Sequence, residues 1–363
     1  MNLWMLALRN LLRNRRRSLA TLLAMVVGLT AILLFGGYRS NILYGMETGF
    51  VQFSGHLQVQ RRGYFVDGGD NHTAYGIAGY QRVIDAIAND PQLAPLLRVV
   101  TPTLQLGGIA GHMESGHTRS VLAQGLVAPD INRLMQWNDY RMVSYAQPLA
   151  LEGTAPHAAV IGTGVARKLQ LCAALQVPHC TNASTNASTN AYTSARTSAA
   201  VQAPEAPAVP DDVAALSALE RSPDAERPPT RIEMLVATAK GAPNVASLQA
   251  IKAVNLGIKA IDDMYLAMHL PQAQRLLYGT QAPEVTSIVV QLQHTAQLPA
   301  ARARLQALLA QDFAAQDLEV LDFRTLNPMF GQTDEFMASM FGFIALLRSE
   351  ERRVGKECLR LCR

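Results

Sequence analysis

This sequence lacks the motifs that mark the common kinds of enzyme chemistry. A phosphate-binding loop needs Gly-x-x-x-x-Gly-Lys-Ser/Thr, and the chain's one Gly-Lys pair is followed by Glu357. Neither the Gly-x-Ser-x-Gly of hydrolases nor the His-Glu-x-x-His of zinc proteases occurs. The sequence therefore predicts no catalytic residue and no bound cofactor.

Cysteine is scarce, with only four in 363 residues, so no disulfide framework is expected. Cys172 and Cys180 are close enough to pair across a short loop in an oxidising compartment. We interpret both as free or incidental cysteines, with the pairing kept as the alternative.

Acidic residues are absent before Glu47, whereas the first 17 residues carry five arginines. These arginines are Arg9, Arg13, Arg15, Arg16 and Arg17. The last 16 residues are also basic, so the middle of the chain is net acidic despite the overall charge of +4. This distribution does not indicate a nucleic-acid partner.

A long uncharged run, residues 18–38, follows the arginines. At about 1.5 Å per residue it reaches roughly 30 Å, the thickness of the hydrocarbon core of a bilayer. Cationic flanks stay in the cytoplasm, so the N-terminus is expected on the cytoplasmic side of the membrane and the bulk of the chain on the outer side. A cleaved signal peptide is the alternative, but the run is too long and ends at Tyr38 without a small-x-small site.

Residues 1–17 form a candidate amphipathic helix on the cytoplasmic side. One face carries Trp4, Leu8, Leu11 and Leu12. Such a helix is suited to lie in the lipid interface, with its cations near anionic headgroups. The same residues serve equally well as a topology signal or as contacts for a cytoplasmic partner.

The residues from 39 to 328 predict an α+β domain with mixed sheets and short helices. Strands are expected at 55–61, 97–109, 118–126, 232–238, 285–292 and 318–323, and helices at 80–89, 270–278 and 299–312. Residues 160–171 are expected to pass from strand to helix, and 248–261 to form a strand pair or a strand and a turn. The last strand–helix–strand segment is typical of a βαβ-type unit in a covered sheet.

Residues 178–229 differ in composition from the rest of the chain. They are rich in Ala, Ser, Thr and Pro and begin with a period-four repeat. They hold too few large apolar residues to offset the entropy of ordering, which predicts a disordered insertion. A second apolar stretch, 329–347, is interpreted as the start of another membrane helix. Residues 348–363 break this pattern abruptly and are interpreted as a tail that is not native.

Three potential metal ligands lie close together in the turn region GHMESGH. They are His112, Glu114 and His117. A solvated polar hairpin explains them equally well, so we predict no metal site there.

Several segments, in order, resemble an ABC transporter permease of the FtsX/MacB/lipoprotein-releasing class. The opening ALRNLLRNRRRSLATLLAMVVGL is similar to that family's cytoplasmic helix, arginine cluster and first span. His56-Leu-Gln-Val, Val160-Ile-Gly-Thr-Gly-Val-Ala and Leu326-Asn-Pro-Met-Phe330 are similar to segments of its extracytoplasmic core domain and of its return to the membrane.

The resemblance implies a four-span permease of the inner (plasma) membrane with a periplasmic core domain. It implies that the permease works as a dimer of two copies or paralogues in the lipid bilayer. It implies a cytoplasmic ABC ATPase that contacts the N-terminal helix, transport by mechanotransmission, and a periplasmic lipoprotein carrier or export partner. Further spans are missing from this chain, and the insertion falls where relatives can project a partner-docking hairpin. The alternative is a single-span receptor or scaffold with an outer binding domain and no transport.

Overall fold

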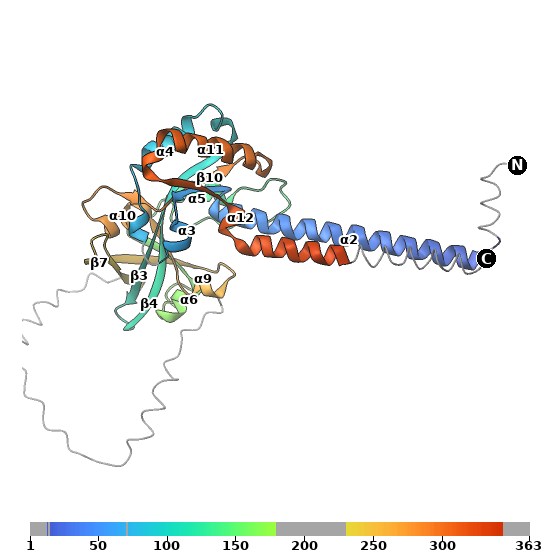
Figure 1. Cartoon of the computed structure of the whole chain (residues 1–363). Helices are drawn as coiled ribbons and strands as arrows, with labels where there is room; N and C mark the ends of the chain where they lie inside the picture. Colours follow the sequence, from blue (N-terminus) through green and yellow to red (C-terminus); the bar gives the residue numbers. More distant parts are fainter. Residues whose placement is uncertain (1–12, 14, 70–71, 179–229, 344–363) are drawn as a thin grey trace, which may run out of the picture.

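The computed structural model describes residue 13 and residues 15–69, 72–178 and 230–343. The expected N-terminal helix with Trp4, Leu8, Arg9, Leu11 and Leu12, nearly all of the insertion, and the segment from 344 onward lie outside these residues. Within them the chain is a mixed α+β domain attached to a long helix, so the α+β prediction is confirmed (Figure 1).

The long helix α2 (Arg15–Ser54) contains the predicted membrane span. It has 40 residues, or about 60 Å at 1.5 Å per residue. Its apolar window is not buried by any other part of the described chain, and it is the one described helix long and apolar enough to cross a membrane. The helix does not end with the uncharged run at Tyr38 but continues without a break to Ser54.

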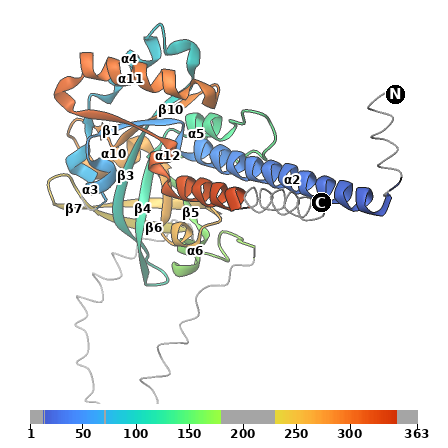
Figure 2. The ribbon, with the colours of Figure 1, turned by 45° about the vertical axis from the view of Figure 1, so that its right-hand side comes forward.

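A second helix, residues 328–343, returns alongside α2 (Figures 1 and 2). The rings of Phe35 and Phe341 stack with centroids 6.1 Å apart. Arg39, the first charge after the uncharged run, forms an ion pair with Asp334 at 2.5 Å. The two helices therefore form an antiparallel pair on one side of the domain.

The half of the domain next to α2, here called the attached lobe, is a four-stranded antiparallel sheet. Its strand order is β11-β1-β10-β3. The strands are β1 (Leu57–Arg61), β10 (Ser287–Leu292), β11 (Leu318–Asp322) and the first half of β3 (Leu97–His112). Helix α4 (Tyr80–Asn89) connects β1 to β3, and α11 (Leu298–Asp312) connects β10 to β11. This is the ferredoxin-like β-α-β-β-α-β arrangement, in which each helix joins two parallel strands that have a third strand between them.

The other half, here called the barrel lobe, is a closed ring of six strands. Its order is β3-β4-β8-β5-β7-β6, and a short pairing of β6 with β3 closes it. The bounds are β4 (His117–Leu126), β5 (Ala158–Gly162), β6 (Arg231–Ala237), β7 (Pro243–Val254) and β8 (Tyr265–His269). Helix α10 (Leu270–Tyr278) packs against β3, β4, β7 and β8. The single strand β3 belongs to both lobes, because its first half pairs with β10 and its second half with β4 and β6.

Smaller elements complete the domain. Helices α3 (Tyr64–Asp67), α5 (Ala128–Met135), α6 (Thr163–Lys168), α9 (Lys259–Asp262) and α12 (Phe323–Leu326) are short, and β2 (Ile77–Ala78) pairs with β9 (Glu284–Val285). Single 3-10 turns lie at His72–Tyr75, Ala94–Leu96, Thr295–Gln297 and Ala314–Gln316.

The apolar patterns explain most of these elements. Val83 and Ile87 of α4 are fully buried with Ile84 partly covered, as their helical spacing predicts. All six residues of β10 are buried, as expected for an unbroken apolar strand covered on both faces. The predicted βαβ unit is confirmed, with β1 lying between its two parallel strands. Of the two alternatives for 248–261, the strand and turn is confirmed: the strand β7 is followed by a turn, and then by the short helix α9, which was not predicted.

Candidate functional site at the membrane-proximal junction

The last turns of α2 are built into the domain. Thr48, Val51 and Gln52 are buried, with exposed fractions between 0% and 3%. Val51 packs in a cluster with Trp137, Phe323 and Phe330. The helix therefore ends as part of the protein core and not as a tether to it.

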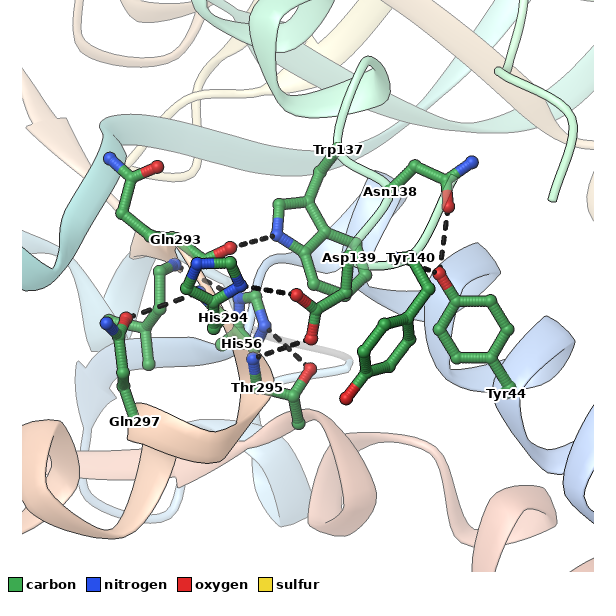
Figure 3. Close-up of polar contacts among 11 residues, drawn as sticks. Tyr44, His56, Trp137, Asn138, Asp139, Tyr140, Gln293, His294, Thr295 and Gln297 are labelled. Atoms are coloured by element: carbon green, nitrogen blue, oxygen red, sulfur yellow. Dashed lines mark hydrogen bonds and ion pairs between the residues drawn. The ribbon is translucent and has the colours of Figure 1, made fainter. Parts of the chain in front are cut away.

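Trp137, directly after α5, is the centre of this junction. Its side chain is fully buried, and its indole Nε1 donates to the backbone oxygen of Gln293 at 3.1 Å (Figure 3). Its own backbone oxygen accepts from the side chain of Gln52 at 2.8 Å. One residue thus connects α2 to the end of β10.

A glycine sets the direction in which the chain leaves α2. Gly55 adopts a left-handed φ of +70°, which glycine reaches without steric cost. A Cβ there would lie 2.5 Å from Val289 Cγ1 and 2.9 Å from the Val290 oxygen. Only glycine therefore lets α2 pass this close to β10 before β1 begins.

His56 follows Gly55 and is completely buried. Its Nδ1 accepts from the Leu292 amide at 3.1 Å, so Nε2 carries the proton and donates to Thr295 Oγ1 at 3.2 Å (Figure 3). Burial lowers the pKa of His56 to about 3, and the nearby charge of Asp139 opposes this only in part. The imidazole is therefore neutral at physiological pH, and its ring meets Trp137 edge-on.

The loop after Trp137 is fastened to α2 by a tyrosine. Tyr44 donates to Asn138 Oδ1 at 2.8 Å and accepts from the Tyr140 amide at 2.8 Å (Figure 3). The rings of Tyr44 and Tyr140 lie 5.3 Å apart. Between them Asp139 pairs with His294 at 2.5 Å, which joins the loop to the segment after β10.

The returning helix enters the same cluster. Phe330 meets Phe50 of α2 at 6.5 Å and Phe323 of α12 at 5.4 Å between ring centroids. Asp322, the last residue of β11, caps α12 by accepting from the Thr325 amide at 2.8 Å. Both α2 and the returning helix therefore reach the same aromatic cluster at the base of the attached lobe.

The possible metal ligands lie far from this junction, at the β3–β4 hairpin. His112 and Glu114 come within 3.8 Å, but His112 Nδ1 also faces the Leu169 oxygen at 3.1 Å. His117 turns to the Ser115 oxygen at 2.6 Å. Among the described residues no three His, Cys, Asp or Glu side chains are grouped to hold a metal ion. The histidines instead fasten the hairpin to the end of α6.

One cysteine prediction is wrong. Cys172 is buried and disulfide-bonded, so it is neither free nor incidental. It is the one cysteine in the described part of the chain, so its partner lies outside that part. The preference for a free cysteine failed because sequence spacing alone does not reveal whether two thiols meet.

The remaining predicted site residues are described only in part. Arg13 is exposed, Arg15 and Arg16 are exposed at the start of α2, and Arg17 is within the helix. The four residues of the candidate ATPase-contact face lie outside the described residues. The junction residues Gln52, Trp137 and Gln293 were not predicted, because no local motif joins positions so far apart in the sequence.

Comparisons with known proteins give distant structural likeness only. No protein-family model and no curated protein matches the chain. The periplasmic region of MacB from Actinobacillus actinomycetemcomitans shares 10% identity at a TM-score of 0.39, covering 77% of this chain and 94% of that one. The extracellular domain of the ABC-type transporter YknZ from Gram-positive bacteria shares 11% identity at a TM-score of 0.35, covering 73% and 99%. TM-scores below 0.5 do not establish a common fold or function.

Proposed function

We propose that this chain is the membrane permease subunit of an ABC transporter of the FtsX/MacB/lipoprotein-releasing class. It would couple ATP hydrolysis by a separate cytoplasmic subunit to movements of the outer domain, for lipoprotein release or for export. The proposal starts from the resemblance in the sequence and is supported by the geometry of the junction.

The observation that carries the proposal is the continuity of α2. One 40-residue helix contains the whole uncharged run and ends in the buried cluster around Trp137. A receptor or scaffold needs only a flexible tether between its anchor and its binding domain. A continuous helix, paired with a returning helix through Phe341 and Asp334, is suited instead to transmit a displacement.

Two further features support a domain outside the cytoplasm. The arginines at 13 and 15–17 precede the uncharged run, which favours a cytoplasmic N-terminus. The disulfide of Cys172 is typical of an oxidising compartment, such as the periplasm.

The proposed partners follow from the same model. The cytoplasmic ATPase would contact the face formed by Trp4, Leu8, Leu11 and Leu12, and a second permease copy or paralogue would complete a dimer in the bilayer. A lipoprotein carrier or an export partner would meet the outer domain.

The decisive test is to break α2 between membrane and domain. Asn41 is exposed on the helix, beyond the uncharged run and before the buried turns. Asn41→Pro removes one helical hydrogen bond and costs about 3 kcal/mol locally, whereas Asn41→Ala preserves the helix. In proteoliposomes with the ATPase, the proline variant should lose transport-coupled ATP hydrolysis and the alanine variant should keep it. Full coupling in both variants would contradict mechanotransmission through α2.

A second test addresses the ATPase contact. Replacing Leu8, Leu11 and Leu12 together with Asp should uncouple ATP hydrolysis while leaving the outer domain folded. Coupling at the parental level would remove that role for the N-terminal helix.

A further inference from the structure

Exposed apolar side chains gather in the loop between α5 and Leu149, residues 138–147, here called the junction loop. Tyr140, Met142 and Tyr145 are 67%, 68% and 56% exposed. Arg141 is exposed beside them. Solvent-exposed aromatic and methionine side chains grouped in one loop indicate a surface that is covered in the assembled system.

The first two polar side chains of this loop, Asn138 and Asp139, are turned toward the protein. The loop's one acidic residue, Asp139, has a side chain only 6% exposed, because it pairs with His294. Asn138 is likewise buried and bonds to Tyr44 and to the Val143 oxygen. The side chains that face outward are two tyrosines, a methionine and an arginine, together with Ser144 and Gln147. Tyrosine is enriched at membrane–water interfaces, and arginine is attracted to the anionic surface of lipid headgroups.

The distance of the junction loop from the hydrocarbon core of the bilayer can be calculated from the rise of α2. Tyr44 lies six residues beyond Tyr38, the last residue of the uncharged run, which is about 9 Å along the helix. Its side chain slopes back toward the N-terminus of the helix, so its hydroxyl lies lower still. That hydroxyl accepts from the Tyr140 amide. A headgroup layer is about 5–8 Å thick on each side of the hydrocarbon core, so the loop lies at its level.

We propose that the junction loop is a second membrane contact, with Tyr140, Met142 and Tyr145 in the headgroup layer of the outer leaflet and Arg141 at the lipid phosphates. The inference rests on the proposed function only through the insertion of α2 in a bilayer. Figures 1 and 2 agree that the loop following α5 lies beside the end of α2 that joins the domain.

This contact would give the domain two supports on the membrane. Tyr44 joins the loop to α2, and Trp137 joins the start of the loop to Gln52 and to β10. A change in the tilt of α2 would therefore lift or press the loop against the lipid surface. The lipid contact would act as a fixed point for that movement.

The test uses tryptophan as a probe in the full chain. Met142→Trp is reconstituted in phosphatidylcholine vesicles with and without lipids brominated near the headgroup, and the parent's emission is subtracted to remove Trp4 and Trp137. The control is Met113→Trp, which is 77% exposed in the parent at the β3–β4 hairpin. This hairpin lies about 50 Å along β3 from Leu97 at the junction.

Bromolipid should quench the Met142→Trp signal at least about twofold more than the Met113→Trp signal, because only the first probe lies at the interface. Tyr145→Trp should behave as Met142→Trp does, which guards against a local defect at one position. A probe at 142 that is open to aqueous acrylamide and not to bromolipid would overturn the proposal. A probe shielded from both quenchers would also overturn it, since another protein copy would then cover the loop.

Coupled ATP hydrolysis is measured on the same variants reconstituted with the ATPase. If the probe at 142 makes no bromolipid contact while coupling is intact, the membrane contact is rejected and the proposed function is not. The Asn41→Pro test does not use these probes, so full coupling in that variant would reject the proposed function and leave the membrane contact standing.

Discussion

The two lobes are held together in different ways, although one apolar core runs through both. The attached lobe has a base of aromatic rings and buried hydrogen bonds around Trp137 and His56. The barrel lobe has close glycine contacts between the backbones of different elements where β5 and α6 meet α9, whereas the attached lobe has, in its described residues, one such contact at Gly55. At Gly162 a Cβ would lie 2.2 Å from the Asp262 oxygen, and at Gly164 it would lie 2.7 Å from the Asp263 Cα.

This difference indicates different tasks. Directional hydrogen bonds from Gln52 to Trp137 and from Gln291 to Val51 fix the orientation of α2 on the attached lobe. Close glycine packing makes the barrel a dense body with little room to deform. Four changes would break or sharpen the comparison, and they can be followed separately in each lobe by hydrogen exchange.

The largest effect is expected for Trp137→Ala. Removing this fully buried ring should lower the free energy of unfolding by about 3–5 kcal/mol, and hydrogen-exchange protection should fall most in β10 and the end of α2. Trp137→Phe keeps a ring but leaves the Gln293 oxygen without the indole donor, so a smaller loss is expected. Equal loss of protection in both lobes would show that they unfold as one unit.

Gly162→Ala should act on the barrel lobe. The added methyl meets the backbone of Asp262, so the strand must shift, at a cost of about 1–3 kcal/mol. Gly107→Ala is the matched control, because no atom lies within 4 Å of its added Cβ. Urea unfolding with exchange readout should place the loss in β5 and β8, and an effect confined to the attached lobe would contradict this assignment.

Acid should weaken the attached lobe through His56. Its pKa is lowered to about 3, so below pH 6.5 the unfolded chain binds a proton that the folded chain refuses, and stability falls as pH falls toward 3. Between pH 7 and 5 this amounts to about 2 kcal/mol. His56→Asn retains an acceptor for the Leu292 amide but cannot titrate. The difference between the two stability curves should therefore shrink as pH falls, and parallel curves would refute the buried neutral histidine.

The smallest effect is expected for the ion pair between Asp90 and Arg304 on the outer face of the attached lobe. The hydrogen bond from Arg304 is the main cause that lowers the pKa of Asp90 to about 2, with the Leu93 and Gln92 amides contributing. The pair therefore stabilises the fold above pH 3.8, and this contribution is lost as pH falls through about 2.

Arg304→Met should lower the urea midpoint at pH 7 and flatten that acid decline. Arg304→Lys should fall between the parent and Arg304→Met, because it keeps the charge without the two-pronged geometry. An unchanged midpoint in both variants would show that the pair does not stabilise the lobe.

Local patterns in the sequence were enough to predict most elements. The spacing of apolar residues predicted helices at 80–89 and 270–278, and these are the bounds of α4 and α10 in the structure. The apolar stretch 285–292 predicted the buried strand β10. The first residue of that prediction, Val285, belongs instead to the small strand β9.

Contacts between distant segments could not be predicted in this way. The part of α2 after Tyr38 carries polar residues such as Asn41 and Glu47, so the apolar run gave no sign that the helix continues to Ser54. Closure of the barrel depends on β6 reaching Ile109 across more than a hundred residues. The bond from Trp137 to Gln293 spans 156 positions, and a buried tryptophan is not distinguished from an exposed one by its neighbours.

The shared strand β3 has a mechanical consequence. Its 16 residues start beside the membrane-directed helices and end at the far hairpin, with hydrogen bonds to both sheets along the way. Such a strand behaves as a lever about 50 Å long, and a pivot of about 5° at its base would swing the hairpin tip by about 4 Å. A rotation too small to disturb the packing at the start of β3 would thus move the β3–β4 hairpin by about the size of a side chain.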